Sequence, residues 1–471
     1  MKRQKTKIIA TIGPACESPE IIARMIEAGM DIARLNFSHG DFVGHSRRIM
    51  ALREAERITG KRIAILADLP GPKIRLGVFR DDAVELRAGD RFTLTTHQVE
   101  GTRERVTVCF GPLPKVVRPG CRIFLNDGLV ELEVERAYDT EVECRVIVGG
   151  ELRSRKGLNI PGVELGVGAF TDHDRACLEF AVQHGVDAVG QSFVGRGDDL
   201  DAVRAAVPEG YPAPFVIAKI ERATALQRLD EILRSADGIM VARGDLGVEV
   251  PIEEIAIVQK KLIAKANLAG KPVITATQML ESMVNNRLPT RAEATDVANA
   301  VLDGTDCLML SAESAMGKYP VEAVRMLARI AAFAEAHRPT GSLQGLHDMC
   351  HEQPSMSQAE SIALVVEHAL ETVKCAAVFV PTRTGTTARM ISRFKPAVWI
   401  VALSRDRKVC QSLHFSAGVV PVHLETEPGD WAGFVKRWLK ENSVAGDLAM
   451  LVTGPSEQHP DANHRLEFVR V

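Results

Sequence analysis

Residues 237–277 read DGIMVARGDLGVEVPIEEIAIVQKKLIAKANLAGKPVITAT, and they decide the fold. The segments 237–242 and 271–277 are short apolar runs without polar alternation, which is typical of strands buried on both faces of a parallel sheet. Between them a helical pattern opens with Pro251 and ends at Gly270, residue types that favour helix ends. A strand, a helix and a second strand in this order predict a β-α-β unit.

The same unit recurs along much of the chain. Strands are predicted at 5–12, 30–37, 62–68, 186–193, 214–220, 237–242, 271–277 and 306–311. Because helical patterns alternate with these strands, the sequence predicts an α/β fold built on a (β/α)8 TIM barrel.

Two segments depart from this rhythm. Short alternating strands and turns between 70 and 157 predict a small β-barrel lid domain, inserted after the third barrel strand at Pro70-Gly71-Pro72. A C-terminal α/β effector domain is predicted over 339–471, with strands at 376–382, 398–404, 418–424, 448–454 and 466–471. The barrel then consists of 1–69 and 158–338.

Composition excludes several classes of protein. The 471 residues carry a net charge of -3, which gives no basic surface for nucleic acid. Nine cysteines without a C-x-x-C pair argue for reduced thiols and a cytoplasmic location. No apolar run approaches the about 20 residues of a membrane-spanning helix. We therefore expect a soluble cytoplasmic protein with neither nucleic acid nor membrane as a partner.

Polar side chains gather where the predicted barrel strands end, which is where barrels carry their active sites. These strand ends supply Arg34, Asn36, Ser38, His39, Asp68, Lys219, Glu221, Gly244, Asp245, Thr277, Ser311 and Glu313. These residues are candidates for a functional site because they share one predicted face of the barrel. Taken singly, Thr277 and Ser311 are more typical of helix caps than of catalytic groups, and Glu313 is expected to be structural.

Glu221 and Asp245 follow successive strands and have no Cys or His nearby, so they predict a magnesium site. Arg34 and Lys219 beside the metal would neutralise a phosphoryl group during transfer. Gly244 would let its backbone N–H approach a substrate carboxylate closely. The simpler alternative is that Lys219 is an ordinary ion-pair partner of Glu221.

Several long segments, taken in their order along the chain, resemble the pyruvate kinase family. They are TKIIATIGPA, AGMDIARLNFSHG, IAKIER, IMVARGDLGVEVP, KPVITATQMLESM and PTRAEATDVANAVLDGTDCLMLSAESAMGKYP. The resemblance covers the whole length, including the lid and the C-terminal domain. It implies phosphoryl transfer from phosphoenolpyruvate to ADP, which gives pyruvate and ATP, with Mg²⁺ or Mn²⁺ as cofactor and a homotetramer as assembly.

The resemblance also assigns roles to individual residues. Arg34 and Lys219 contact the transferred phosphoryl group, and Lys219 steadies the enolate left behind. Glu221 and Asp245 hold the metal. The substrate carboxylate is bound by Gly244, Asp245 and Thr277, and the nucleotide by Asn36, His39, Arg75 and Lys156. Thr277 and Ser311 lie where a hydroxyl and water relay would protonate the enolate.

Residues 67–75, ADLPGPKIR, suggest independence from potassium. In potassium-dependent relatives, a monovalent cation lies among oxygens that match Asn36, Ser38, Asp68 and the carbonyl of residue 69. Most relatives carry glutamate where this chain has Lys73, and threonine where it has Leu69. Because an ammonium is a compact point charge, we expect Lys73 to reach Asp68 as an internal cation, so that K⁺ is not required. An exposed surface lysine is the alternative.

The C-terminal domain contains a candidate effector loop in PTRTGTTARMISRF, residues 381–394. Hydroxyls and backbone N–H groups gather at a predicted helix start through Thr382, Thr384, Gly385, Thr386 and Thr387, which suits a phosphate. Residues 454–464, GPSEQHPDANH, are acidic and lack tryptophan, so a sugar monophosphate or AMP is expected rather than a bisphosphate. A plain capped turn is the alternative.

Two other functions use similar residues. A phosphoenolpyruvate-using carbon–carbon lyase on a magnesium barrel would not need a lid, Arg75 or Lys156. A catalytically inactive barrel that senses a metabolite should have lost Lys219, Glu221 or Asp245, and the chain retains all three.

Overall fold

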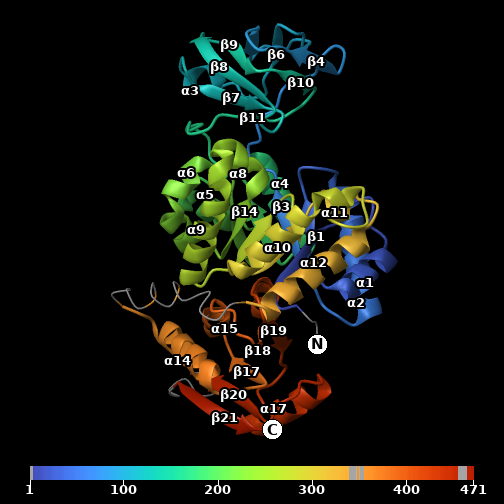
Figure 1. Cartoon of the computed structure of the whole chain (residues 1–471), viewed down its shortest axis with the longest axis vertical. Helices are drawn as coiled ribbons and strands as arrows, with labels where there is room; N and C mark the ends of the chain where they lie inside the picture. The colour runs from blue at the N-terminus through green and yellow to red at the C-terminus, as the bar shows by residue number, and fades with distance from the viewer. Residues whose placement is uncertain (1–3, 339–345, 347–349, 351–354, 455–463) are drawn as a thin grey trace.

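The computed structural model describes residues 4–338, 346, 350, 355–454 and 464–471. Figure 1 shows three parts along the long axis, with the lid at one end, the barrel in the middle and the C-terminal domain at the other end. Among the described helices, none is long and apolar enough to cross a membrane.

The central part is a closed barrel of eight parallel strands, which confirms the predicted fold class. The strands are β1 (Lys7–Thr11), β2 (Met30–Asn36), β3 (Ala64–Leu69), β12 (Ala188–Gln191), β13 (Phe215–Ile220), β14 (Gly238–Ala242), β15 (Val273–Ala276) and β16 (Cys307–Leu310). Around the barrel they follow the order β1-β16-β15-β14-β13-β12-β3-β2. Each matches one of the predicted strands, because short apolar runs that alternate with helical patterns favour buried parallel strands.

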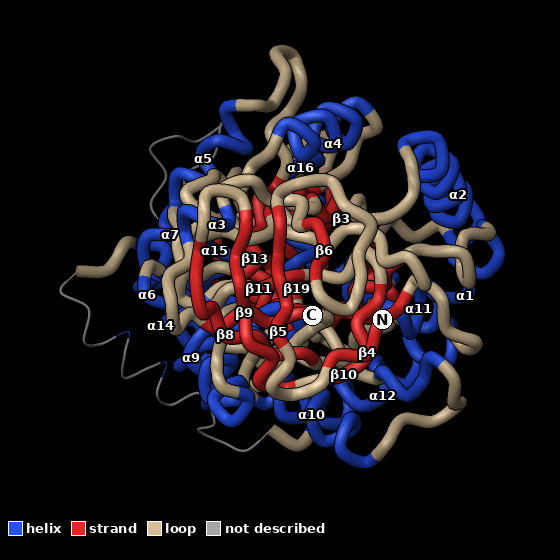
Figure 2. The backbone as a smooth tube through the Cα atoms, turned by 90° about the horizontal axis from the view of Figure 1, so that it is seen from above, coloured by secondary structure: helices blue, strands red, loops and turns tan. Residues whose placement is uncertain are grey.

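Helices surround these strands, as the view from above in Figure 2 shows. They are α1 (Pro19–Ala28), α2 (Phe42–Thr59), α4 (Asp172–Gln183), α5 (Gly197–Ala205), α6 (Ala223–Gln227), α7 (Leu229–Ser235), α8 (Arg243–Glu249), α9 (Ile255–Leu268), α10 (Arg291–Leu302), α11 (Ala312–Ala315) and α12 (Pro320–Ala336). The helix predicted from Pro251 begins with a 3-10 turn, and Gly270 follows its end with φ +63°, a conformation that favours glycine.

The lid is built from β4 (Ala83–Leu86), β5 (Arg91–Thr95), β6 (Arg105–Thr107), α3 (Leu113–Val116), β7 (Arg122–Leu125), β8 (Val130–Ala137), β9 (Glu141–Val148), β10 (Gly150–Arg153) and β11 (Leu158–Asn159). Its strands form a six-stranded sheet, β11-β7-β8-β9-β5-β6, and a two-stranded sheet, β10-β4. Because β11 pairs with β7, residues 158 and 159 lie on the lid sheet, beyond the boundary expected at 157.

The C-terminal domain has a five-stranded sheet in the order β19-β18-β17-β20-β21, and all five of its strands were predicted. Its elements are α14 (Gln358–Thr372), β17 (Ala377–Pro381), α15 (Thr386–Ser392), β18 (Trp399–Ser404), α16 (Arg407–Ser412), β19 (Val419–His423), α17 (Trp431–Glu441), β20 (Leu448–Thr453) and β21 (Arg465–Arg470).

One aromatic side chain of the C-terminal domain closes the lower end of the barrel. Phe415 is fully buried among side chains that point into the barrel, including Ile217 and Met240. Its ring stacks on Phe215 with centroids 5.4 Å apart, and its carbonyl accepts a hydrogen bond from the Cys307 thiol at 3.2 Å. The C-terminal domain therefore contributes directly to the barrel core.

Candidate active site

Lys219 is the centre of a buried charge cluster at the carboxyl end of β13. Its Nζ lies 3.0 Å from Asp68 Oδ1 and 2.8 Å from Glu221 Oε1. It also donates a hydrogen bond to Ser192 Oγ at 2.6 Å. Burial lowers the pKa of Lys219, but the two carboxylates outweigh burial and raise it above its ordinary value. The side chain is therefore a fixed ammonium.

Asp68, at the end of β3, links Lys219 to a second cation, Arg34. Arg34 from β2 donates to Asp68 Oδ2 through Nε at 2.7 Å, and Arg34 Nη2 lies 2.6 Å from the same oxygen. Burial opposes ionisation of Asp68, but Lys219 and Arg34 outweigh it and hold its pKa below the ordinary value. At the mouth of the barrel, the cations of Arg34 and Lys219 thus both pair with the buried carboxylate of Asp68.

Glu221 and Asp245, the carboxylates expected to hold a divalent metal ion, lie beyond the neighbouring barrel strands β13 and β14. Glu221 is 1% exposed, and its Oε2 accepts a hydrogen bond from Phe193 N at 2.7 Å. Burial raises the pKa of Glu221, Lys219 opposes the rise, and Asp245 adds to it. A hard cation shared by the two carboxylates would relieve this repulsion, so the residues fit the metal.

Among the described residues, no group of three or more His, Cys, Asp or Glu side chains gathers as a metal cluster. Any divalent ion at Glu221 and Asp245 would complete its coordination shell with water and substrate oxygens, as Mg²⁺ commonly does.

The structure places Lys73 away from the position that the sequence predicted. Its Nζ lies 3.2 Å from Asp245 Oδ1, and this ion pair stands in place of the expected contact with Asp68. Asp68 has no need of Lys73, because Arg34 and Lys219 already pair with it.

Two other oxygens of the expected monovalent-cation pocket also have partners within the protein. The Leu69 carbonyl accepts a hydrogen bond from Ser192 Oγ at 2.7 Å. Asn36 Oδ1 accepts one from Ser38 N at 3.1 Å.

Thr277 follows β15 with a strained backbone. Its φ is +73°, and Gln278 follows at +54°, although left-handed values are unusual for β-branched residues. Arg243 holds this turn by donating to the Ala276 carbonyl at 3.2 Å and the Thr277 carbonyl at 2.7 Å. A Cβ at Gly244 would lie only 2.8 Å from Thr277 Cγ2, so glycine is required there.

Ser311 starts α11, and its backbone N–H donates to Glu313 Oε2 at 2.7 Å. Glu313 Oε1 accepts from Leu280 N at 3.1 Å, and the side chain is fully buried. Glu313 therefore has the structural role that the sequence predicted.

Of the residues expected to bind nucleotide, Asn36 ends β2 and His39 follows it, whereas Arg75 and Lys156 lie where the lid joins the barrel. Arg75 forms an isolated antiparallel β-bridge with Gly157, which follows Lys156, so the two segments that connect lid and barrel meet here. Arg75 Nη1 donates to the Arg155 carbonyl at 3.2 Å. Burial and the charges of Arg75, Arg34 and Lys73 lower the pKa of His39, which favours its neutral form.

Sequence reasoning missed three residues of this site: Ser192, Phe193 and Arg243. The QSF segment at 191–193 ends a predicted strand, so its position at the mouth was a usable signal. Arg243 also directly follows a predicted strand, but its ion pair with Asp296 and its contacts with the Ala276 and Thr277 carbonyls could not be predicted from that position.

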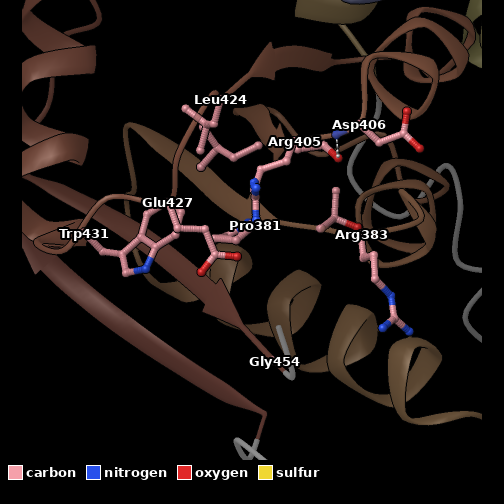
Figure 3. A pocket seen from close by; sticks show the side chains of 11 residues that line it. Pro381, Arg383, Arg405, Asp406, Leu424, Glu427, Trp431 and Gly454 are labelled. Atoms are coloured by element: carbon pink, nitrogen blue, oxygen red, sulfur yellow. Dashed lines mark hydrogen bonds between the residues drawn. The ribbon is translucent and has the colours of Figure 1, made fainter. Parts of the chain in front are cut away.

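A pocket in the C-terminal domain lies beside the candidate effector loop. Its lining includes Thr382, Arg383, Arg405, Glu427 and Trp431. Arg405 extends toward Glu427, whereas Arg383 points away from Trp431 (Figure 3). The segment expected to limit this site to one phosphate, 454–464, lies outside the described residues over 455–463.

The effector loop itself is held by hydroxyls. Gly385 N donates to Thr382 Oγ1 at 2.9 Å, and the hydroxyls of Thr384 and Thr386 lie 2.9 Å apart. Arg389, from α15, donates to the Thr384 carbonyl at 2.7 Å.

Comparison with known proteins gives a consistent result. The family described as pyruvate kinase, barrel domain, matches residues 3–324, and its alpha/beta domain matches 360–463. The pyruvate kinase of Thermococcus litoralis is 49% identical over 451 residues, which span 96% of this chain and 92% of that protein. That of Thermotoga maritima is 41% identical over 460 residues, 96% of each chain.

A solved structure agrees. The crystal structure of a pyruvate kinase from Cryptosporidium parvum matches with a TM-score of 0.93 and 36% identity, over 99% of this chain and 96% of that one. This chain belongs to the pyruvate kinase family.

Proposed function

We propose that the cluster around Lys219 is the site at which this chain transfers the phosphoryl group of phosphoenolpyruvate to ADP. Pyruvate kinase activity, the last step of glycolysis, follows from the family. The observation that carries the site assignment is the buried set of Lys219, Arg34 and Asp68 beside the carboxylates Glu221 and Asp245. Phosphoryl transfer needs positioned charge more than covalent chemistry, and this set supplies it.

The two cations have different parts in this proposal. Arg34 is a planar fork fixed by Asp68, and it orients the phosphoryl oxygens. Lys219 is a compact charge, and it stabilises the negative charge that develops on the phosphoryl and enolate oxygens. The nucleotide lies on the side of Asn36, His39, Arg75 and Lys156, under the lid.

The family requires a divalent metal, and Glu221 and Asp245 are the residues that would hold Mg²⁺ or Mn²⁺. When bound, the ion adds positive charge beside the phosphoryl oxygens. The substrate carboxylate is bound by the backbone of Gly244 and Asp245 and by Thr277. The strained turn at Thr277 supports this, because such strain collects at functional sites.

The enolate is protonated after the phosphoryl group has left. Thr277 and Ser311 each directly follow a barrel strand, and a relay through their hydroxyls and water would deliver the proton. Their strands, β15 and β16, are neighbours in the barrel.

An assay of pyruvate formed from phosphoenolpyruvate, with and without ADP, tests this function. Pyruvate and ATP should appear in equal amounts, and only when ADP is present. Consumption of phosphoenolpyruvate without ADP would favour a carbon–carbon lyase, and no turnover at all would favour a metabolite sensor.

Potassium independence is a further part of the proposal, and with it a place in the lysine-containing bacterial subgroup. The ammonium of Lys73 supports it, because it puts a tethered positive charge at Asp245, next to the expected phosphoryl position. Two oxygens of the expected potassium pocket also accept hydrogen bonds within the protein, Asn36 Oδ1 from Ser38 N and the Leu69 carbonyl from Ser192 Oγ.

An activator with one phosphate is proposed for the pocket of the C-terminal domain. Arg405 and Thr382 line this pocket, and Trp431 offers a flat apolar wall. Titration with sugar monophosphates, AMP and fructose bisphosphate at low phosphoenolpyruvate tests this. Activation by fructose bisphosphate alone would contradict it.

A homotetramer in the cytoplasm completes the proposal. An apolar surface between α10 and α12, lined by Ala298, Leu302 and Ile330, supports association of copies. Phe333 on this surface is 68% exposed in the single chain. Sedimentation equilibrium should give four copies, and a monomer at micromolar concentration would contradict the assembly.

A further inference from the structure

We propose that Ser192 is a positioning residue for the ammonium of Lys219, and that it ties this ammonium to the segment from which the lid leaves the barrel. The segment is Pro70-Gly71-Pro72, here called the lid hinge. The inference rests on the proposed function, in which Lys219 is the catalytic cation.

The hydrogen bonds around Ser192 have only one possible direction. An ammonium has three donors and no acceptor, so Lys219 must donate to Ser192 Oγ, at 2.6 Å. The hydroxyl of Ser192 then donates to the Leu69 carbonyl at 2.7 Å, because a carbonyl can only accept. The result is a chain of two hydrogen bonds from the catalytic ammonium to the last residue of β3.

Ser192 completes the set of acceptors around Lys219. The three protons of the ammonium meet Asp68, Glu221 and Ser192, at 3.0, 2.8 and 2.6 Å. Ser192 is the neutral member of the three, so it fixes the direction of the ammonium without adding negative charge where the phosphoryl group must bind.

The hinge packs directly on Ser192. Leu69 precedes Pro70, and a Cβ on Gly71 would lie 3.0 Å from Ser192 Cβ and 2.9 Å from Phe193 Cδ2. Gly71 itself has φ +65°, so glycine serves both the turn and the close approach. A shift of the hinge would therefore move the acceptor of the Ser192 hydroxyl.

The backbone after Ser192 is held in an unusual conformation. Phe193 has φ +57°, and its N–H donates to Glu221 Oε2 at 2.7 Å. Gln191 Nε2 donates to the Ser192 carbonyl at 3.0 Å and to the Ala169 carbonyl at 2.8 Å. The residues that follow β12 thus contact two groups of the site. Ser192 accepts a hydrogen bond from the ammonium of Lys219, and Phe193 donates one to the carboxylate of Glu221.

A lysine side chain has four rotatable bonds, so its ammonium needs fixed acceptors to stay in place. Misplacement of a reacting group by about 1 Å can cost about a hundredfold in rate. Loss of the Ser192 hydroxyl should therefore reduce kcat more than it weakens substrate binding.

The test compares Ser192→Ala with a matched control, Ser392→Ala. Ser392 is also buried, and its hydroxyl donates to the Ala417 carbonyl at 2.7 Å in the C-terminal domain. We expect S192A to lose about ten- to a hundredfold in kcat while the Michaelis constant for phosphoenolpyruvate changes less than about threefold. S392A should lose a similar amount of thermal stability and keep its kcat. S192C, which replaces the hydroxyl with a thiol that is only a weak acceptor, should behave like S192A.

A double variant separates positioning from general damage. If Ser192 acts through Lys219, adding S192A to Lys219→Met should change the remaining rate less than about twofold. Equal losses in both backgrounds, a kcat of S192A within about threefold of the parent, or the same loss in S392A would each overturn the inference. A parent chain without ADP-dependent pyruvate formation would refute the proposed function itself.

Discussion

Lys73 shows how much one side chain can alter a site. Its ammonium, 30% exposed as a side chain, pairs with Asp245 at 3.2 Å. A glutamate at this position would put a second negative charge next to Asp245 and call for a free cation from solution. We expect Lys73→Glu to require potassium, whereas the parent chain should not.

The measurement is the initial rate in tetramethylammonium buffer against added potassium chloride. Lys73→Met is the matched control, because it removes the positive charge without adding a negative one, and it should respond less to potassium than Lys73→Glu. A parent rate that rises tenfold with potassium would contradict potassium independence.

Among the elements, α14 has a pH-dependent side chain. Burial raises the pKa of Glu367 to about 7, Glu371 adds to the rise, and Arg338 opposes it. The unfolded chain should have the ordinary value of about 4.3. Between these values the folded state binds more protons, so this carboxyl stabilises the fold at low pH, and that contribution is lost as pH rises toward 7.

The melting temperature of Glu367→Gln minus that of the parent should therefore be larger at pH 8 than at pH 5. Thermal unfolding at both pH values measures this, with the exposed Glu425→Gln as control. A difference between Glu367→Gln and the parent that does not change with pH would show that the carboxyl titrates normally.

The elements were largely predictable from the sequence, and their contacts were not. The eight barrel strands and four of the five C-terminal strands come from largely apolar runs, whereas β21 mixes charged and apolar residues. Their order then puts Lys219, Glu221 and Asp245 at one mouth. The partner of Lys73 could not be predicted in this way, because a long side chain after a Pro-Gly-Pro turn can reach more than one carboxylate. The pairing of Asp68 with Arg34 and Lys219 depends on β2 and β13, which are far apart in the sequence.

At the scale of the whole molecule, Phe415 joins two domains into one core. Truncating a buried phenylalanine to alanine commonly costs about 3–5 kcal/mol. Because the ring lies inside the lower end of the barrel, we expect Phe415→Ala to destabilise the barrel although the residue belongs to the C-terminal domain.

Denaturant unfolding followed by circular dichroism measures this change. Phe468→Ala is the control, since that ring is 46% exposed and should cost much less. Equal stability of Phe415→Ala and the parent would mean that the two domains do not share a core.

The central claim is that Lys219 acts in the transition state of phosphoryl transfer. Its removal takes away a preorganised charge, which typically costs about 10²–10³ in kcat. The direct measurement is the steady-state rate of pyruvate formation by Lys219→Met, with its Michaelis constant for phosphoenolpyruvate. We predict a kcat at least a hundredfold below the parent and a Michaelis constant that changes little. A variant that keeps a tenth of the parent rate would contradict the account.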